Sequence, residues 1–210
     1  MVDCSRVVYD SSNSSIITTS HTNSQKSVVL TFDDGPSRLL PSILDVLKKE
    51  EIQAVFFWQS KLIYPARPWK RLLDEGHQIG THSTKHRNLA ALTYEKQYQD
   101  IRNSIRKIEE ITGTKLEYFR PPYGQYNKDT IKAAEALNVT PVLWRLASMD
   151  WELKDDPNQI VTYVTDNLED GAIILLHELT QTLEVLPALI QAIRDKGYGF
   201  SKLKIKGRNV

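Results

Sequence analysis

The sequence predicts an α/β fold in which parallel strands alternate with helices around one sheet. Three observations support this prediction. The length of 210 residues suits a single domain, short apolar runs alternate with longer amphipathic stretches after residue 26, and conspicuous polar residues follow several apolar runs. An alternation of strand and helix specifies a parallel sheet covered by helices.

Seven short apolar runs are predicted to form strands. They are rich in Val, Ile, Phe and Leu, are bounded by polar or turn residues, and are too short for helices. These runs span residues 27–32, 53–58, 78–81, 118–120, 139–143, 172–176 and 199–203.

Four stretches between these runs are predicted to form helices. Apolar side chains repeat on one face of residues 40–50 and of residues 94–111, and Gly113 is a natural stop for the second. Asp156 is an N-cap followed by proline, which predicts a helix to about residue 168. The fourth helix spans residues 183–196 and ends before Gly197.

Two sheet arrangements fit this alternation, a doubly wound open sheet and a barrel. Barrel enzymes collect catalytic groups from many strands on one rim, whereas an open sheet gathers them at one switch point. The polar residues that follow different strands favour the barrel, and they are Asp33, Asp34, His82, Arg120 and His177.

Residues 1–25 are predicted to be a disordered or extended tail or linker, and residues 26–210 the folded domain. Ser, Thr and Asn dominate residues 11–24, a composition that buries little apolar surface. No basic segment followed by an apolar one opens the chain, so we expect no signal peptide in it. We expect an extracellular or cell-envelope location if the natural chain begins before Met1, and a cytoplasmic one otherwise.

Composition excludes several classes of function. Twenty-seven basic and 26 acidic residues give a net charge of +1, which argues against nucleic acid as a partner. No apolar run reaches the roughly 18 residues expected of a transmembrane segment. The single cysteine, Cys4, excludes an internal disulfide framework and a Cys-based zinc site.

A metal site is the chemistry that the polar residues suggest. Asp33 and Asp34 end a buried strand, where two acids repel unless a cation or an arginine compensates them. His82 and His86, four residues apart, converge on one ion if their segment coils like a helix turn. Two histidines and one carboxylate suit catalytic zinc. Each feature alone has an alternative interpretation. Asp33 or Asp34 could cap the following helix, and the spacing of His82 and His86 could arise by chance.

Hydrolysis at such a centre also needs a base and an acid. Asp33 and His177 are placed by sequence to serve as these, and Arg120 would keep Asp33 ionised. Alternatively, His177 is a buried histidine of the core, and Arg120 is an arginine that holds a loop in place.

The order of the motifs resembles a known family. TFDDGP (31–36), HSTKH (82–86), RPPYG (120–124), MDW (149–151) and LLHE (175–178) are similar to the five motifs of carbohydrate esterase family 4 polysaccharide deacetylases, the NodB-homology domain. The resemblance covers residues 26–203. It implies a distorted (β/α)7 barrel and metal-dependent removal of N-acetyl groups from polymers such as peptidoglycan, chitin or poly-N-acetylglucosamine. The enzyme class implied is a hydrolase of linear amides.

The resemblance also implies a role for each motif residue. Asp33 is the general base, His177 the general acid, and Arg120 orients Asp33. One divalent ion is implied, with zinc expected first and cobalt, nickel or manganese as alternatives. Its ligands are Asp34, His82 and His86. Asp150 tunes His177 or Arg120, and the backbone N–H of Tyr123 holds the oxyanion. The substrate-binding residues are Pro121, Tyr123, Trp151 and Leu175.

The sequence departs from the family pattern in several places. Ala147 stands where the fourth motif usually carries an acid, Glu178 is longer than the usual acid, and a common glycine is missing at Gln59 and Ser60. Two other functions stay open: a cytoplasmic hydrolase of a small cyclic amide or imide on the same barrel, and an inactive carbohydrate-binding protein. The expected partner is an acetylated polysaccharide, and we expect the chain to be a monomer.

Overall fold

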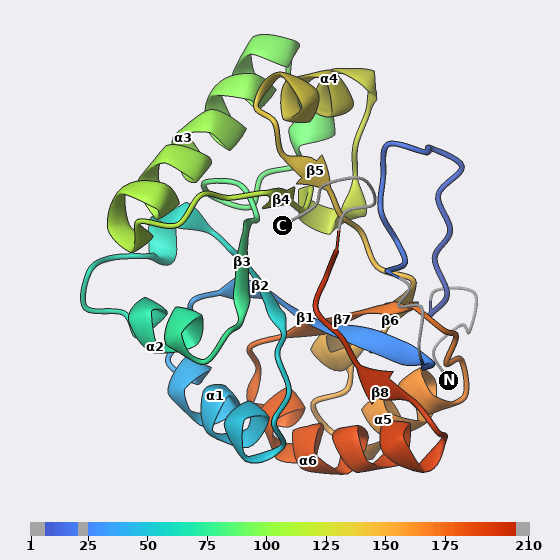
Figure 1. Ribbon diagram of the computed structural model, residues 1–210. Coiled ribbons are helices and arrows are strands. Elements are labelled where there is room, and N and C mark those ends of the chain that lie inside the picture. The colour runs from blue at the N-terminus through green and yellow to red at the C-terminus, as the bar shows by residue number, and fades with distance from the viewer. Residues whose placement is uncertain (1–6, 21–24, 205–210) are drawn as a thin grey trace.

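The computed structural model describes residues 7–20 and 25–204. In these residues the strands form one curled parallel sheet in the order β5-β4-β3-β2-β1-β7-β6, with β8 paired to β1 (Figure 1). The strands are β1 (Ser27–Gly35), β2 (Val55–Trp58), β3 (Gln78–Thr81), β4 (Tyr118–Phe119), β5 (Thr140–Pro141), β6 (Leu146–Ala147), β7 (Ile173–His177) and β8 (Gly199–Phe200). The curl confirms the distorted (β/α)7 barrel over the doubly wound open sheet.

Helices ring the outside of the curled sheet (Figure 1). They are α1 (Leu40–Lys49), α2 (Trp69–Asp74), α3 (Tyr94–Thr112), α4 (Lys128–Ala136), α5 (Asn158–Thr165) and α6 (Thr180–Asp195). Short 3₁₀ helices also occur, η2 (Ser60–Leu62), η3 (Leu89–Ala91), η4 (Pro122–Gly124) and η5 (Asp150–Glu152). Helices α2 and α4 and strand β6 were not among the predicted elements, and only two residues of the predicted strand 139–143 are paired as β5.

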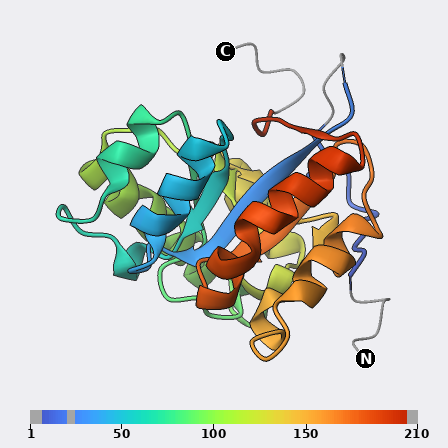
Figure 2. The same cartoon turned by 90° about the horizontal axis from the view of Figure 1, so that it is seen from below.

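The side chains of β1 alternate between the two faces of the sheet, as a strand requires. Val28, Leu30 and Phe32 belong to the large core cluster that includes buried side chains of α1 and α6, whereas Val29 belongs to a separate cluster. Figure 2 shows α1, α6 and α5 lying next to one another over the outer face. The alternation therefore leaves Thr31 and Asp33 on the inner face, where Arg120 contacts both.

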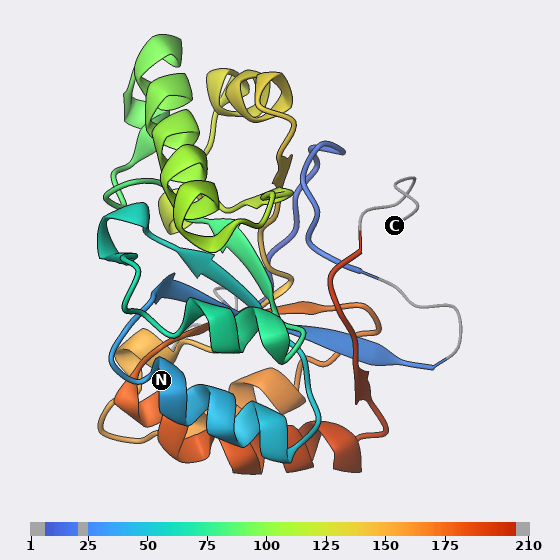
Figure 3. The ribbon, with the colours of Figure 1, turned by 60° about the vertical axis from the view of Figure 1, so that its left-hand side comes forward.

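Helices α3 and α4 pack against each other on the side of the molecule formed by β4 and β5 (Figure 3). Apolar side chains on one face of α3, such as Ile101, share a buried cluster with Phe119 of β4 and with Ala133 and Ala134 of α4. Gly113 ends α3 in the left-handed conformation, as the sequence predicted. This packing fixes the position of the loop that leaves β4 with Arg120.

The N-terminal segment, residues 7–20, lies between the two edge strands of the sheet (Figure 1). Val8 pairs with Leu146 of β6, and Ile17 pairs with Val142 just after β5. Backbone hydrogen bonds join Ile17 N to Pro141 O at 3.0 Å and Ala147 N to Val7 O at 2.7 Å. Residues 7–20, predicted as part of a disordered or extended tail or linker, thus pair with both edges of the gap in the barrel.

Cys4 lies outside the described residues. No helix in the described part of the chain is both long enough and apolar enough to span a membrane.

Candidate active site

The two adjacent aspartates at the end of β1 lie in different backbone conformations. Asp33 pairs in register with Phe57 of β2 and His177 of β7. The register shifts between Asp33 and Gly35, so that Asp34 is an extra residue in the strand with φ of 66°. Such a bulge re-aims a side chain. Asp33 therefore keeps its inward direction while Asp34 turns toward the histidines that follow β3.

Asp34, His82 and His86 form a cluster with the geometry of a metal site. Their ligand atoms all lie within 4.8 Å of one another. Asp34 Oδ1 is 3.5 Å from His86 Nε2 and 3.8 Å from His82 Nε2. A tetrahedral zinc ion, with bonds of about 2.0–2.2 Å, separates its ligands by roughly 3.4 Å. The distances and the set of two imidazoles and one carboxylate therefore fit one divalent ion.

The segment that carries the two histidines is a turn and not a helix turn, the geometry under which their spacing would let them converge. Ser83 and His86 both have positive φ, 67° and 54°. The turn is held because His86 N donates to Ser83 Oγ at 3.0 Å and Thr84 N donates to Asp100 Oδ1 of α3 at 2.7 Å. The two imidazoles still converge, with ring centroids 4.8 Å apart.

The orientation of His82 is fixed by a hydrogen bond on its far side. Its Nδ1 donates to the backbone oxygen of Arg120 at 2.7 Å, and the side chain is buried. A donor bond from Nδ1 places the neutral tautomer with Nε2 free as a ligand. Burial raises the pKa of Asp34, but the imidazoles of His82, His86 and His177 lower it below its ordinary value. The carboxylate is therefore ready to bind a cation.

Asp33 and Arg120 form a buried ion pair on the inner face of the barrel. Arg120 Nη1 donates to Asp33 Oδ1 at 2.8 Å, and both side chains are almost fully inaccessible to solvent. The guanidinium also donates to Thr31 Oγ1 and to the backbone oxygens of Val142 and Leu143. Asp33 Oδ2 is left 3.6 Å from His82 Nε2, at the edge of the cluster formed by Asp34, His82 and His86. Arg120 thus fixes one oxygen and leaves the other facing the site.

His177 is held by Asp150 on the opposite side of the cluster. His177 Nδ1 donates to Asp150 Oδ1 at 2.7 Å, and Asp150 Oδ2 accepts from His177 N and from Thr182 Oγ1. Burial lowers the pKa of His177, but the charge and hydrogen bond of Asp150 outweigh it and raise this pKa to about 9. His177 Nε2 points toward the cluster, 4.0 Å from Asp34 Oδ2. An imidazolium at this position is a suitable acid.

The structure brings two exposed aromatic side chains to the edges of this cluster. The ring of Tyr123 lies 4.4 Å from the ring of His86, and that of Trp151 lies 5.3 Å from the ring of His177. Tyr123 is 61% exposed and Trp151 is 40% exposed. By contrast, Pro121 and Leu175, also expected to bind substrate, are buried.

Glu178, the residue after His177, holds the turn that follows the aspartates. Its carboxylate accepts from Ser37 N at 2.6 Å and from Trp58 Nε1 at 3.1 Å. A Cβ atom on Gly35 would lie 1.8 Å from Glu178 Oε1, so only glycine fits there. Burial raises the pKa of Glu178. This longer acid therefore links the end of β7 to the turn after β1.

Gln59 and Thr182 are among the residues at the site that the sequence did not single out as functional. Gln59 Nε2 donates to Asp34 Oδ1 at 2.7 Å, and Thr182 donates to Asp150. The only sequence signal was the missing glycine at Gln59, which did not indicate the partner.

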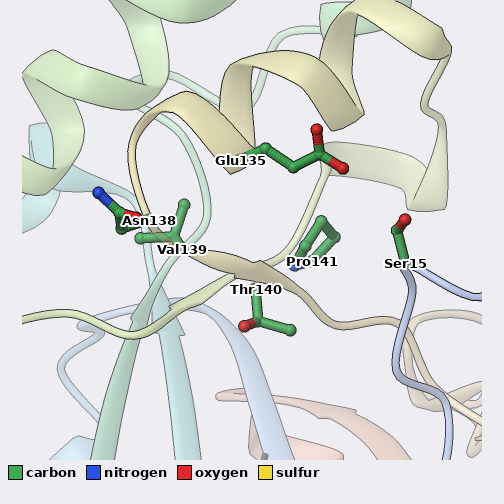
Figure 4. A pocket seen from close by; sticks show the side chains of 6 residues that line it. All are labelled: Ser15, Glu135, Asn138, Val139, Thr140 and Pro141. Carbon is green, nitrogen blue, oxygen red and sulfur yellow. The ribbon is translucent and has the colours of Figure 1, made fainter.

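A separate hollow of about 280 Å³ lies near β5 (Figure 4). It is lined by Ser15, Glu135, Asn138, Val139, Thr140 and Pro141. One carboxylate is the only charged side chain among these six residues, and none of them belongs to the cluster described above. The hollow therefore offers no set of groups for acid–base or metal chemistry.

Comparisons with known proteins place the chain in a family. Residues 20–142 match the family model described as polysaccharide deacetylase. The chain is 33% identical over 178 residues to the peptidoglycan-N-acetylglucosamine deacetylase PgdA of Listeria monocytogenes. That match covers 83% of this chain but 37% of the relative, so the chain spans little more than a third of that protein.

Two solved structures share the fold. The Bc1960 peptidoglycan N-acetylglucosamine deacetylase has a TM-score of 0.81 at 29% identity, covering 90% of this chain and 95% of that one. The second structure is BA3943, described as a carbohydrate esterase family 4 pseudoenzyme from Bacillus anthracis. It has a TM-score of 0.80 at 27% identity, covering 88% of this chain and 66% of that one. These matches confirm the predicted family and enzyme class: the chain belongs to the polysaccharide deacetylase family.

Proposed function

We propose that this chain removes N-acetyl groups from a polysaccharide by metal-dependent hydrolysis. One observation carries the proposal: a cluster of two histidines and one aspartate lies between a buried carboxylate, Asp33, and a histidine with a raised pKa, His177. Groups of this kind are what amide hydrolysis requires. A cell-envelope location, where such polymers occur, is part of the proposal.

Asp34, His82 and His86 are the residues that would hold the ion, and zinc suits this donor set. A divalent ion bound there supplies Lewis-acid polarisation of the acetyl carbonyl and lowers the pKa of water.

The chain's own residues then carry the protons. Asp33 accepts a proton from the water as it attacks the acetyl carbon. The N–H of Tyr123 donates to the oxyanion that forms, a kind of contact worth roughly 3–4 kcal/mol. His177 donates its proton to the sugar nitrogen as the C–N bond breaks, which releases acetate and the free amine. Asp150 keeps His177 protonated and correctly turned for this transfer.

Exposed aromatic side chains favour a polymer over a small cyclic amide as substrate. Among the described residues the large exposed hydrophobic side chains are Tyr64, Tyr123 and Trp151, and the last two border the cluster. Tyrosine and tryptophan carry an apolar face and a polar tip, which suits contact with a sugar ring. The similarity to the Bc1960 deacetylase makes acetylated peptidoglycan the first polymer to test.

The likeness to BA3943 keeps an inactive carbohydrate-binding protein as the second candidate. Both candidates bind a carbohydrate, and they differ only in whether its acetyl groups are hydrolysed. The side chains proposed as base and acid are both present, at 3.6 Å and 4.0 Å from the metal cluster.

Acetate release from a panel of acetylated glycans tests the proposal. The panel contains peptidoglycan and oligomers of N-acetylglucosamine, and ring opening of a cyclic imide is followed in a parallel assay, each with and without a chelator. We expect acetate from a glycan, loss of activity with the chelator, and its return when zinc is added. Ring opening of the imide alone would support the small-molecule hydrolase. Glycan binding without turnover would support the inactive protein.

A further inference from the structure

Gln59 contacts the bulge of β1 at two points. It is the first residue after β2, and the residue is 6% exposed. Its backbone N donates to Gly35 O at 2.9 Å, and its side-chain Nε2 donates to Asp34 Oδ1 at 2.7 Å. The two bonds flank a residue whose φ of 66° is unfavourable for a residue with a side chain. Gln59 therefore holds both the backbone and the carboxylate of the bulge.

The oxygen that Gln59 contacts is the one that faces both histidines. Oδ1 lies 3.5 Å and 3.8 Å from the Nε2 atoms of His86 and His82, whereas Oδ2 faces His177 at 4.0 Å. The Asp34 side chain is 41% exposed, so its packing alone does not fix the carboxylate. The bond from Gln59 opposes rotation of the carboxylate and keeps Oδ1 toward the histidines.

This bond is compatible with binding of an ion at the same oxygen. An ionised carboxylate oxygen has more than one lone-pair direction and can accept a hydrogen bond while it coordinates. The other polar atom of the Gln59 side chain, Oε1, is buried and has no hydrogen-bond partner in the structure. The side-chain amide of Gln59 therefore makes its hydrogen bond to Asp34.

We infer that Gln59 is a positioning residue for metal binding: it presets the carboxylate of Asp34 for the ion. The inference rests on the proposed function, because that proposal makes Asp34 a ligand. Partners that orient a metal ligand typically change metal affinity by about 10- to 100-fold when they are removed.

Zinc affinity of the purified full chain, measured by competition with a chromogenic chelator, tests this inference without an activity assay. In Gln59→Met the side chain keeps its length but loses the donor, and we expect the zinc Kd to rise by about 10- to 100-fold. Gln59→Asn keeps the amide but is one methylene too short to reach Asp34, and we expect the same direction of change. The melting temperature of each metal-free variant reports whether it is folded.

Ser60→Ala is the matched control. Ser60 is the next residue, it is also buried, and its Oγ has no hydrogen-bond partner in the structure. We expect its zinc affinity to equal that of the wild type. An unchanged zinc Kd in folded Gln59→Met or Gln59→Asn overturns the inference, as does an equal loss in Ser60→Ala. A wild type that binds no zinc instead overturns the proposed function itself.

Discussion

At the scale of single residues, one backbone feature gives two adjacent carboxylates different environments. Strict alternation along β1 would send the side chain after Asp33 to the outer face, beneath the helices. The bulge at Asp34 breaks the alternation and turns this carboxylate toward the histidines after β3. Asp33 keeps the inward direction and its bond to Arg120. The proposed roles, Asp33 as base and Asp34 as metal ligand, rest on this difference.

Asp33→Asn tests that assignment. We expect acetate release to fall by about 100- to 10,000-fold, because a positioned base is lost. The zinc Kd should stay near that of the wild type, because Asp33 is not among the three proposed ligands. Removal of a charge from a buried ion pair costs about 3–5 kcal/mol, so urea unfolding should show a less stable protein. Loss of zinc binding with turnover retained would reverse the two roles.

The sequence indicated the side chains that the structure brings together at the site, but it did not indicate the residues that position them. Asp33, His82 and His177 could be predicted because their side chains carry chemistry and directly follow apolar strands. The bonds from Gln59 to Asp34 and from Thr182 to Asp150 join residues 25 and 32 positions apart. Such contacts depend on how separate loops cross, and composition and spacing do not encode that.

At the scale of elements, the N-terminal segment shows why composition misleads. Residues 7–20 are rich in Ser, Thr and Asn, yet their backbone groups bond to both edges of the sheet. Backbone hydrogen bonds are available to any residue but proline, so a polar segment can pair with an edge strand. Two apolar side chains anchor it, Val7 and Ile16, both buried.

Ile16→Ala tests whether this segment is part of the folded domain. Ile16 packs with Ile131 and Leu143, so we expect the free energy of unfolding to fall by about 2–4 kcal/mol. Urea denaturation measures this change. Ser14→Ala, at an exposed position in the same segment, is the control and should be neutral. Equal stability of both variants would mean that the segment is a linker that adds nothing to the domain.

Short elements were the hardest to predict. Strand β6 has two residues and helix α2 has six, lengths at which apolar periodicity carries little information. The long helix α3 and the strand β1 were found because their patterns extend over many residues. Whether such a short strand or helix forms depends on its contacts with residues that are distant in the sequence.

His77 lies directly before β3 and contacts the residue directly before β2, and protonation of its ring opposes folding. Nδ1 of the buried His77 accepts a hydrogen bond from Ala54 N at 3.0 Å, which requires the neutral ring. Burial lowers the pKa of His77 to about 4. Since the unfolded chain binds the proton more readily, stability is full above pH ~6.5 and declines as pH falls toward 4, by about 3 kcal/mol.

His77→Asn isolates this effect, because its Oδ1 can accept the same bond without titrating. We expect the loss of unfolding free energy between pH 6.5 and 4 to be about 3 kcal/mol smaller in the variant than in the wild type. Urea denaturation across this range measures the difference. The same pH dependence in both proteins would contradict the assignment.

At the scale of the whole molecule, the parallel topology brings the site together. Parallel strands end on one rim, so residues at the ends of β1 and β7 and just after β3 and β4 meet, although up to 144 positions separate them. The family resemblance predicted this barrel, and the alternation of strands and helices predicted its parallel sheet. Closure by the N-terminal segment could not be predicted, because it depends on a gap that exists only in the folded sheet.

The central claim is that one divalent ion binds between Asp34, His82 and His86, next to the carboxylate of Asp33, which does not bind the ion. Anomalous diffraction at the zinc edge, from crystals of the zinc-loaded protein, tests it most directly. The account predicts one strong peak per chain, about 2.0–2.2 Å from Asp34 and from Nε2 of both histidines. An empty site in crystals that hold zinc elsewhere, or an ion bound by Asp33 instead of Asp34, would contradict it.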